Sequence, residues 1–422
     1  MATANQIIVA YYAASAAHDV ARYRNLCTHN YLILDRCRIC SRTDFRNPQR
    51  TGNQTLALSG KRGVAPARAR LAGVPATFDE AGSRFETHGG VNRMLTSKLP
   101  MLLAALATGL STFVFAQSAP TPPDAELRAA MEWAFPLNPP PAAHAPMPDM
   151  HKPLHVPGSA RTYTLADYDH MFGAPDWFPQ DHPPMPRIVA RGRKPAWACA
   201  FCHLPTGQGR PENAPLAGLP AAYIIEQVKA FRSGKRVSGG PEMARFMPAE
   251  ATHVTDADLK QAAGYFSSLH YKPWTQVIET ATVPKTHMVH FILVADTGNA
   301  REPIGNRIIE TSTDIARTEL RDTRFGFVAY VPPGSIARGA VIASKGAGEA
   351  LPCESCHGSD LRGVGNIPPL ASRSPTYIIR ELILFRLGGR ANTAAAPMQQ
   401  EASHLSLRDM IAAAAYAASR KP

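Results

Sequence analysis

The chain has 422 residues and carries 45 Lys and Arg against 33 Asp and Glu, a net charge of +12 at pH 7. Most of this excess lies before residue 117, where 14 basic residues stand against 6 acidic ones, so the rest of the chain gives no electrostatic sign of a nucleic-acid partner. The sequence contains no GxSxG motif, no Gly-rich phosphate loop and no HExxH motif, which removes the common signatures of hydrolases, nucleotide-binding proteins and zinc proteases.

The first 116 residues contain a doubtful leader followed by a predicted export signal. Residues 1–93 have Arg-rich stretches but no sustained helical or strand period, and we expect them to be disordered or to lie outside the native protein, with translation starting at Met94. Residues 94–116 combine a positive start with an apolar middle, the pattern of a secretory signal peptide. Small residues near Ala116 favour cleavage there, with a retained membrane anchor as the alternative.

The next segment, residues 117–185, is a Pro-rich extension. Its first part includes three consecutive prolines at 139–141 and predicts an extended strap or linker rather than a packed domain. Residues 163–181 carry aromatic and acidic side chains around Trp177 and Phe178. We expect them to pack on the unit that follows, with cover for the exposed edge of a cofactor as the alternative.

Two pentapeptides of the form CxxCH, at residues 199–203 and 353–357, are the most specific signals in the chain. On one turn of helix the two cysteines lie on the same face, where their sulfurs can form thioethers with haem vinyl groups, and the adjacent histidine can reach the iron. Zinc is the alternative, but it needs further Cys or His ligands close by, and each copy has at most a single downstream His. The motifs therefore predict two covalently bound haems c. Their predicted binding residues are Cys199, Cys202, His203, Cys353, Cys356 and His357.

The sequence repeats around these two motifs. Aligning Cys199 with Cys353 requires no gap as far as Arg236 and Arg390, and the register resumes after a three-residue difference in length. Each copy contains, in order, a haem motif, a Pro-Leu-Ala segment, an aromatic helix, a loop, a Met and a closing helix. The repeat predicts two units of one fold. These units are expected at residues 186–272 and 337–422, with opening helices at 186–193 and 335–344.

Residues 273–336, between the units, have a different pattern. Short apolar runs at 289–294 and 325–331 are separated by polar turns and predict strands. We expect a small sheet that braces the two units, with partner docking at an unpaired strand edge as a secondary role. His287 and His290 are three apart on a strand-like run, so they point to opposite faces and do not predict a metal site.

The order of elements in each unit resembles that of the class I c-type cytochromes, and the tandem arrangement is similar to the periplasmic two-haem members of that family. The resemblance covers residues 186–272 and 337–420, and the long insertion departs from it. It implies an all-α fold of two class I cytochrome c domains, here with a small β-containing insertion between them and a Pro-rich N-terminal extension. It also implies export to the periplasm, because haem is attached to such proteins outside the cytoplasmic membrane.

In this family the histidine of CxxCH is one axial ligand of the iron, and a methionine from the loop before the last helix is the other. By position this implies Met247 and Met398, each at the same interval before a helix start signal. Met243 is a rival that has no counterpart in the second unit. His253 and His404 are rivals that recur, and ligation by them would lower the potential of the iron.

Two further pairs of residues are implied to support the haems. In the family a proline downstream of CxxCH accepts a hydrogen bond from the proximal histidine, and Pro215 and Pro369 are the matching candidates. Arg236 and Arg390 are candidates for fork-shaped hydrogen bonds to haem propionates, with a solvated surface arginine as the alternative.

The resemblance implies an electron carrier, in which two haems perform outer-sphere electron transfer between redox partners and no residue is catalytic. The implied partners are a dehydrogenase, a cytochrome bc1-type complex or a terminal oxidase, without nucleic acid and, once the signal is cleaved, without a firm membrane anchor. Two alternatives stay open. One is a haem enzyme, either a peroxidase or a small-substrate dehydrogenase with one open iron. The other is the electron-accepting subunit of a larger dehydrogenase or oxidase complex.

Overall fold

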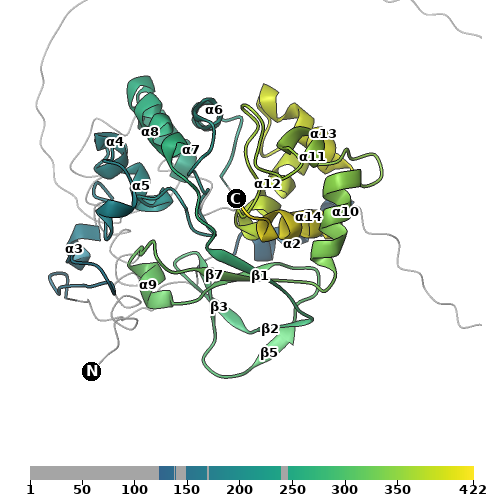
Figure 1. The fold of residues 1–422 in the computed structure, drawn as a ribbon, viewed down its shortest axis with the longest axis horizontal. Coiled ribbons are helices and arrows are strands. Elements are labelled where there is room, and N and C mark those ends of the chain that lie inside the picture. Colours follow the sequence, from purple (N-terminus) through teal and green to yellow (C-terminus); the bar gives the residue numbers. More distant parts are fainter. Residues whose placement is uncertain (1–122, 137, 139–148, 169–170, 239–245) are drawn as a thin grey trace, which may run out of the picture. The chain divides into compact units, whose positions relative to one another are not determined.

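The computed structural model describes residues 123–136, 138, 149–168, 171–238 and 246–422 (Figure 1). The predicted leader at 1–93, the predicted signal at 94–116 and Met243 all lie outside the described residues. Within the described part of the chain, no helix combines the length and the apolar character needed to cross a membrane.

Two helical units carry the sequence repeat, and Figure 1 draws the first in teal and the second in green to yellow. The helices of the first unit are α4 (Arg187–Ala190), α5 (Cys199–His203), α6 (Ala221–Arg232), α7 (Phe246–His253) and α8 (Asp256–Ser268). Those of the second are α10 (Ser335–Lys345), α11 (Glu354–His357), α12 (Pro375–Arg386), α13 (Ala396–Ser403) and α14 (Leu407–Ser419). A helix occurs at each predicted opening segment, although α4 has only four residues and Pro186 is its N-cap.

The closing helix of each unit begins where the sequence indicates. The hydroxyl of Thr255 accepts a hydrogen bond from the backbone N–H of Asp258 at the start of α8, and α14 has the same contact between Ser406 and Asp409. At α14 the carboxylate of Asp409 also accepts from the backbone of Ser406, which completes a capping box. These side chains satisfy backbone donors that the start of a helix otherwise leaves unpaired.

Helices α10 and α14 cross at short range because a glycine lies at the crossing point. A methyl group added at Gly339 would overlap the carbonyl oxygen of Ala412 and lie 2.5 Å from Cβ of Tyr416. The second unit closes its apolar core around this crossing, with Ile383 and Met410 fully buried. Such close packing leaves no room for a larger residue at Gly339.

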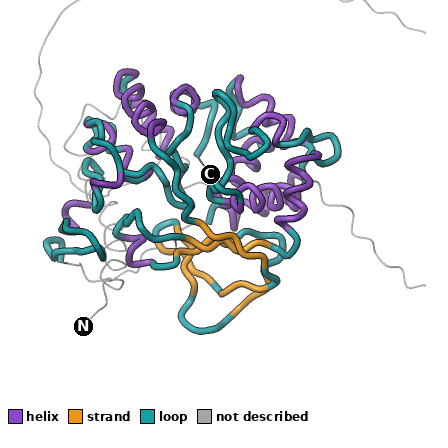
Figure 2. The backbone as a smooth tube through the Cα atoms, in the orientation of Figure 1, coloured by secondary structure: helices purple, strands orange, loops and turns teal. Residues whose placement is uncertain are grey.

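The insertion between the two helical units contains strands, as its apolar runs predicted, and these strands form a mixed sheet. Five strands pair in the order β1, β7, β6, β4, β3, and β2 pairs separately with β5 (orange in Figure 2). The strands are β1 (Thr275–Glu279), β2 (Thr282–Pro284), β3 (Thr286–Val289), β4 (Ile292–Ala295), β5 (Arg301–Pro303), β6 (Ile309–Ser312) and β7 (Phe327–Val331). The β1–β7 and β4–β6 pairs are parallel, whereas the β3–β4, β6–β7 and β2–β5 pairs are antiparallel. The pairing of β1 with β7 joins the two ends of the insertion.

One of the predicted strands is a hairpin. The apolar run at 289–294 contains the end of β3, a two-residue turn and the start of β4. The turn residues, His290 and Phe291, have φ angles of +47° and +68°. Such turns usually contain Gly, Asn or Asp, so a sequence with His and Phe at this point carries no turn signal. His290 therefore lies in a turn and not on a strand face, and its Nδ1 is 2.6 Å from a carboxylate oxygen of Glu319.

The start of the described part of the N-terminal extension is a helix, where the prolines of the extension predicted an extended strap. Residues 123–134 form α2 (Pro123–Ala134), whose Leu127, Ala130 and Ala134 are buried in the core of the second unit. These apolar residues recur at helical spacing, which places them on one face of the helix. The three prolines at 139–141 come after this helix in the sequence, and they lie outside the described residues.

The aromatic part of the extension packs on the insertion. Trp177 and Phe178 are both buried, and Nε1 of Trp177 donates to the carbonyl of Leu320 over 2.6 Å, directly after α9 (Ile315–Glu319). Two short elements flank this region, α3 (Leu165–Tyr168) and the 3-10 helix η2 (Pro179–Asp181).

Candidate haem centres

The first CxxCH motif forms the single helical turn α5, with His203 buried at its end. Nδ1 of His203 lies 2.8 Å from the carbonyl oxygen of Ala214. Because a carbonyl can only accept, Nδ1 carries the proton, and Nε2 is the nitrogen that can ligate iron. Burial lowers the pKa of this imidazole, which favours the neutral form that a metal requires.

The second motif has the same geometry. His357 is buried at the end of α11, and its Nδ1 lies 2.8 Å from the carbonyl oxygen of Pro368. The predicted acceptors were Pro215 and Pro369. In each unit the observed acceptor is the residue that precedes the predicted one in the sequence. The cause is a tight turn in each unit: in the second, the backbone N–H groups of Leu370 and Ala371 both donate to Leu361, which turns the residue before Pro369 toward the imidazole.

The cysteines of the two motifs differ in exposure: Cys356 is exposed, and the other three are partly exposed. Burial raises the pKa of Cys199 to about 12 and that of Cys353 to about 11, so both are protonated at neutral pH. Among the described residues, no group of three or more His, Cys, Asp and Glu side chains is arranged to hold a metal ion. The two sites thus present a pair of thiols and one oriented imidazole each, which matches the attachment chemistry of haem c.

The resemblance implied that Met247 and Met398 lie in a loop. In the structure, both lie on short helices. Met247 is the second residue of α7, and Met398 is the third residue of α13 and packs against the core of the second unit. Each helix directly precedes the closing helix of its unit. Of the rivals, His253 is exposed at the end of α7, and His404 lies 3.3 Å from the carboxylate of Glu349.

Arg236 and Arg390 are buried at the contact between the two units, so the alternative of a solvated surface arginine is wrong for both. Glu381 accepts from Nη2 of Arg236 over 2.9 Å and from Nη1 of Arg390 over 2.7 Å. Gln227, which the repeat aligns with Glu381, accepts from the same two arginines. The backbones join as well, because the N–H of Val237 donates to Gly389 over 2.8 Å.

This contact also tests whether the chain fits a bound haem. The Nε atoms of Arg236 and Arg390 are buried and have no hydrogen-bond partner among the described atoms. A buried donor without a partner costs free energy, and a haem propionate is an acceptor of the kind that would satisfy it. The residues present therefore fit the group that the two motifs imply.

A third buried arginine, Arg373, was not among the residues predicted from the sequence. It connects the second unit to the loop between α5 and α6, which we call the first haem loop. Nη1 and Nη2 of Arg373 donate to the carbonyls of Pro215 (3.1 Å) and Ala217 (2.7 Å). These carbonyls lie in the loop whose Ala214 holds His203. Burial lowers the pKa of Arg373 to about 10, and the repeat places Leu219 at the equivalent position of the first unit. The only feature of the sequence that could have indicated a role for Arg373 is this difference from the aligned residue of the first unit.

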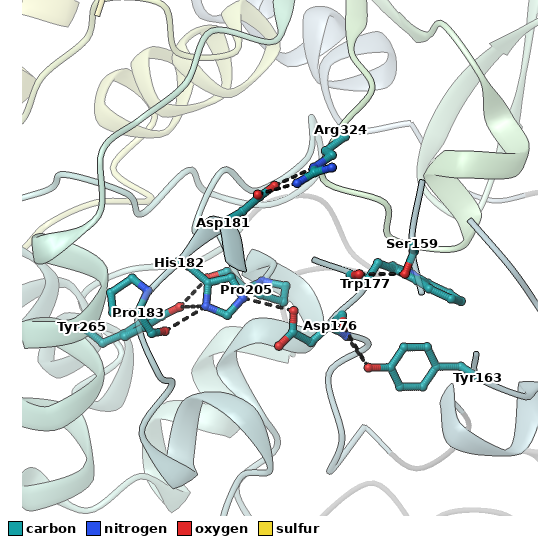
Figure 3. A network of polar contacts seen from close by, with 10 residues as sticks. All are labelled: Ser159, Tyr163, Asp176, Trp177, Asp181, His182, Pro183, Pro205, Tyr265 and Arg324. Carbon is teal, nitrogen blue, oxygen red and sulfur yellow. Dashed lines mark hydrogen bonds and ion pairs between the residues drawn. The ribbon is translucent and has the colours of Figure 1, made fainter. Parts of the chain in front are cut away.

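The extension holds the other side of the first haem loop through a polar network (Figure 3). The hydroxyl of Tyr265, on α8, donates to the carbonyl of Pro205, two residues after His203, over 2.6 Å. Nδ1 of His182 lies 3.1 Å from the same hydroxyl, and its Nε2 lies 3.1 Å from Asp176. The extension therefore fixes the position of the loop that follows His203, the predicted iron ligand.

Comparison with known proteins decides the family. No family model matches the chain. The chain is 40% identical to cytochrome c-552 of Acidithiobacillus ferridurans over 225 residues, which is 52% of this chain and 73% of that protein. This chain belongs to the class I c-type cytochromes. Cytochrome c-554(548) of Halomonas halodenitrificans is 35% identical over 81 residues, which is 19% of this chain and 94% of that protein.

A third relative of this c-type cytochrome is named for its partner. The thiosulfate dehydrogenase electron acceptor of Thiomonas intermedia is 38% identical over 90 residues, which is 21% of this chain and 40% of that protein. The family has covalently bound haem c as its cofactor and transfers electrons between redox proteins. The chain is accordingly an electron carrier with haem c, and its partners are redox proteins.

Proposed function

We propose that this cytochrome is a periplasmic two-haem electron carrier in which each iron has one histidine and one methionine ligand. The observation that carries the proposal is the repeated histidine geometry. His203 and His357 are both buried, and Nδ1 of each is 2.8 Å from a backbone carbonyl, which leaves Nε2 of each for an iron. Two units built in this way support two haems per chain.

The bound haem would supply a reversible one-electron change of its iron, and the chain supplies the setting for it. Cys199 and Cys202 would hold one haem by thioethers, and Cys353 and Cys356 would hold the other. The carbonyls of Ala214 and Pro368 orient the imidazoles and raise their basicity. Met247 and Met398, on the helices before the closing helices, would give the second ligand, and a thioether ligand favours ferrous iron and raises the potential.

Transfer from one haem to the other is supported by the contact between the units. Arg236, Arg390 and Glu381 form one buried ion network across it, and a backbone bridge joins the two loops that carry the arginines. A contact of this kind keeps the two sites at a fixed separation, which outer-sphere transfer requires. No bond is made or broken in the protein, so no catalytic residue is needed.

The compartment and the partners are also part of the proposal. Export through residues 94–116 is supported by the two covalent haem motifs, because haem is attached to c-type cytochromes outside the cytoplasmic membrane. The donor would be a periplasmic dehydrogenase, and the relative named as an acceptor for thiosulfate dehydrogenase supports this class. The acceptor would be a terminal oxidase, and a cytochrome bc1-type complex is an alternative electron donor. A permanent subunit of a dehydrogenase complex is the second candidate, favoured by the same relative.

The test is the ligation state of the holoprotein purified from the periplasm. We expect two haems per chain, low-spin irons in optical and magnetic circular dichroism spectra, the weak far-red ferric band of His/Met ligation, and no reaction with carbon monoxide or peroxide. Met247→Ala and Met398→Ala should each remove half of the far-red band and open one iron to carbon monoxide. Met288→Ala, on β3 of the insertion, is the matched control and should leave the spectrum unchanged. An open iron in the unmodified protein would contradict the carrier and favour the haem enzyme.

A further inference from the structure

The insertion covers the haem motif of the first unit. Nε of Arg321, just after α9, donates to the carbonyl of Phe201 over 2.8 Å, and its guanidinium lies 3.9 Å from the centre of the Phe201 ring. Phe201 lies between the two cysteines of the motif. A second contact comes from Arg210, whose Nη1 donates to the carbonyl of Thr318 over 3.1 Å. All of these residues are buried, so protein covers the outer face of α5.

The second haem motif lacks this cover. The repeat aligns Phe201 with Ser355 and Cys202 with Cys356, and both of these residues of the second unit are exposed. It aligns Arg210 with Val364, whose side chain is 58% exposed. The same face of the fold is therefore closed in the first unit and open in the second, and the difference is due to the insertion.

Exposed apolar side chains precede and follow the open motif in the sequence. Leu351 precedes Cys353 by two residues and is 60% exposed, and Val364 is bridged to Ile367, which is 36% exposed. The loop that carries Val364 and Ile367 is tied to His357, because the N–H of Gly363 donates to the carbonyl of His357 over 2.8 Å. Leu351 is held by a second contact, because its N–H donates to the carboxylate of Glu401 over 2.7 Å. We call Leu351, Val364 and Ile367 the second-haem patch. Large apolar side chains in contact with water at a functional group are typical of a protein-binding surface.

The charged residues next to the patch in the sequence, together with Glu401, which accepts from the N–H of Leu351, are mainly acidic. Four carboxylates stand against two cations in the neighbouring sequence and on α13. These residues are Lys345, Glu349, Glu354, Asp360, Arg362 and Glu401. An apolar centre with a charged rim is the usual composition of a protein–protein interface, and a rim of one sign attracts a partner face of the other sign.

We propose that the second-haem patch is where this cytochrome docks its redox partner, and that the insertion closes the equivalent face of the first unit. The occupant is an electron-transfer protein whose contact face is apolar at its centre and ringed by Lys and Arg side chains. The proposal rests on the proposed function, since it assumes a haem in each unit. It adds that electrons are exchanged with the partner at one docking surface, which we call the port, and that this surface lies at the second haem.

Electron exchange with a basic probe protein tests the port. The holoprotein is mixed in a stopped-flow instrument with mitochondrial cytochrome c, poised in the redox state that drives transfer. Val364→Lys places a cation in the centre of the patch, and we expect the second-order rate constant to fall about tenfold or more. Val341→Lys is the matched control, because Val341 is 52% exposed on α10 outside the patch and the change in net charge is the same. It should leave the rate within about twofold of that of the unmodified protein.

Equal rates for Val364→Lys and Val341→Lys would overturn the port. A second measurement needs no variant: a soluble gadolinium chelate should broaden the NMR signals of the second haem's methyl groups more than those of the first. Equal broadening, or stronger broadening of the first, would also overturn it. Two other outcomes would contradict the proposed function itself. In one, the unmodified protein holds fewer than two haems; in the other, it exchanges no electrons with any reductant.

Discussion

Glu381 is the carboxylate on which the contact between the two cytochrome units depends. Its side chain is 15% exposed and binds Arg236 and Arg390, both buried, through its two oxygens. Glu381→Gln keeps the size of the side chain and removes its charge. The variant would place two guanidinium groups between two amides, because the equivalent residue of the first unit, Gln227, already accepts from both arginines.

Removing one partner from a buried ion pair leaves the other charge without compensation, which typically costs about 3–5 kcal/mol. Because haem propionates at the Nε atoms of the two arginines would offset part of the lost charge, we expect at most a loss of this size in the free energy of unfolding of the holoprotein, measured by urea titration with far-UV circular dichroism. Glu302→Gln is the matched control, because Glu302 pairs with Arg307 at the protein surface, where both side chains are about one third exposed. That pair is worth about 0–1 kcal/mol. Equal losses in the two variants would refute the argument from buried charge.

The pH dependence separates charge from shape at Glu381. Burial opposes its charged form, yet Arg236 and Arg390 hold the pKa of this carboxyl below its usual value. A group with a lowered pKa stabilises the folded state above its unfolded value of about 4.3, and this contribution is lost as the pH falls through the folded pKa. The stability difference between the protein and Glu381→Gln should thus be constant near neutral pH and shrink in acid. A difference that does not change in acid would point to lost packing instead.

Three further substitutions have defined outcomes. Gly339→Ala should lower the stability of the second unit by about 1–3 kcal/mol, because its methyl group overlaps Ala412. A melting temperature equal to that of the unmodified protein would contradict the close approach of α10 and α14. Ser406→Ala removes the N-cap of α14 and should cost about 1 kcal/mol in urea titration, whereas Ser406→Thr, which keeps the hydroxyl that donates to Asp409, should retain most of the stability. Arg373→Met removes a cation from the first haem loop, which should lower the midpoint potential of the first haem more than that of the second in a spectroelectrochemical titration; equal shifts would refute a local effect.

The parts of the structure that follow from neighbouring residues could be predicted from the sequence. A CxxCH motif requires a fixed spacing on one helical turn, and both copies form such a turn. An N-cap depends on a hydroxyl and a backbone group three residues away, and Thr255 and Ser406 both form one. The repeat likewise predicted the two units, because each position of one unit has the same neighbours as its counterpart.

The parts that depend on distant contacts could not be predicted. Arg373 binds carbonyls more than 150 residues away, and nothing near it in the sequence indicates this. Pro215 was predicted as the hydrogen-bond acceptor of His203, but the acceptor is Ala214. The tight turn, and not the residue type, decides which carbonyl faces His203. The helix α2 was missed because prolines dominate the composition of the whole extension and conceal the apolar face that begins at Leu127.

The asymmetry of the two haem sites has to arise where the repeat is broken. The units share their motif, their histidine geometry and the place of their methionine, so these features alone would give two equivalent irons. Glu381 has Gln227 as its counterpart, Arg373 has Leu219, and Val364 has Arg210. The first two of these differences place a charge in one unit that the other lacks, and a nearby charge changes the relative stability of ferric and ferrous iron. The third lies on the face that the insertion covers in the first unit and leaves uncovered in the second. For the two haems proposed above, this difference in field would make one iron easier to reduce than the other, and two separate midpoint potentials in a spectroelectrochemical titration are the expected result.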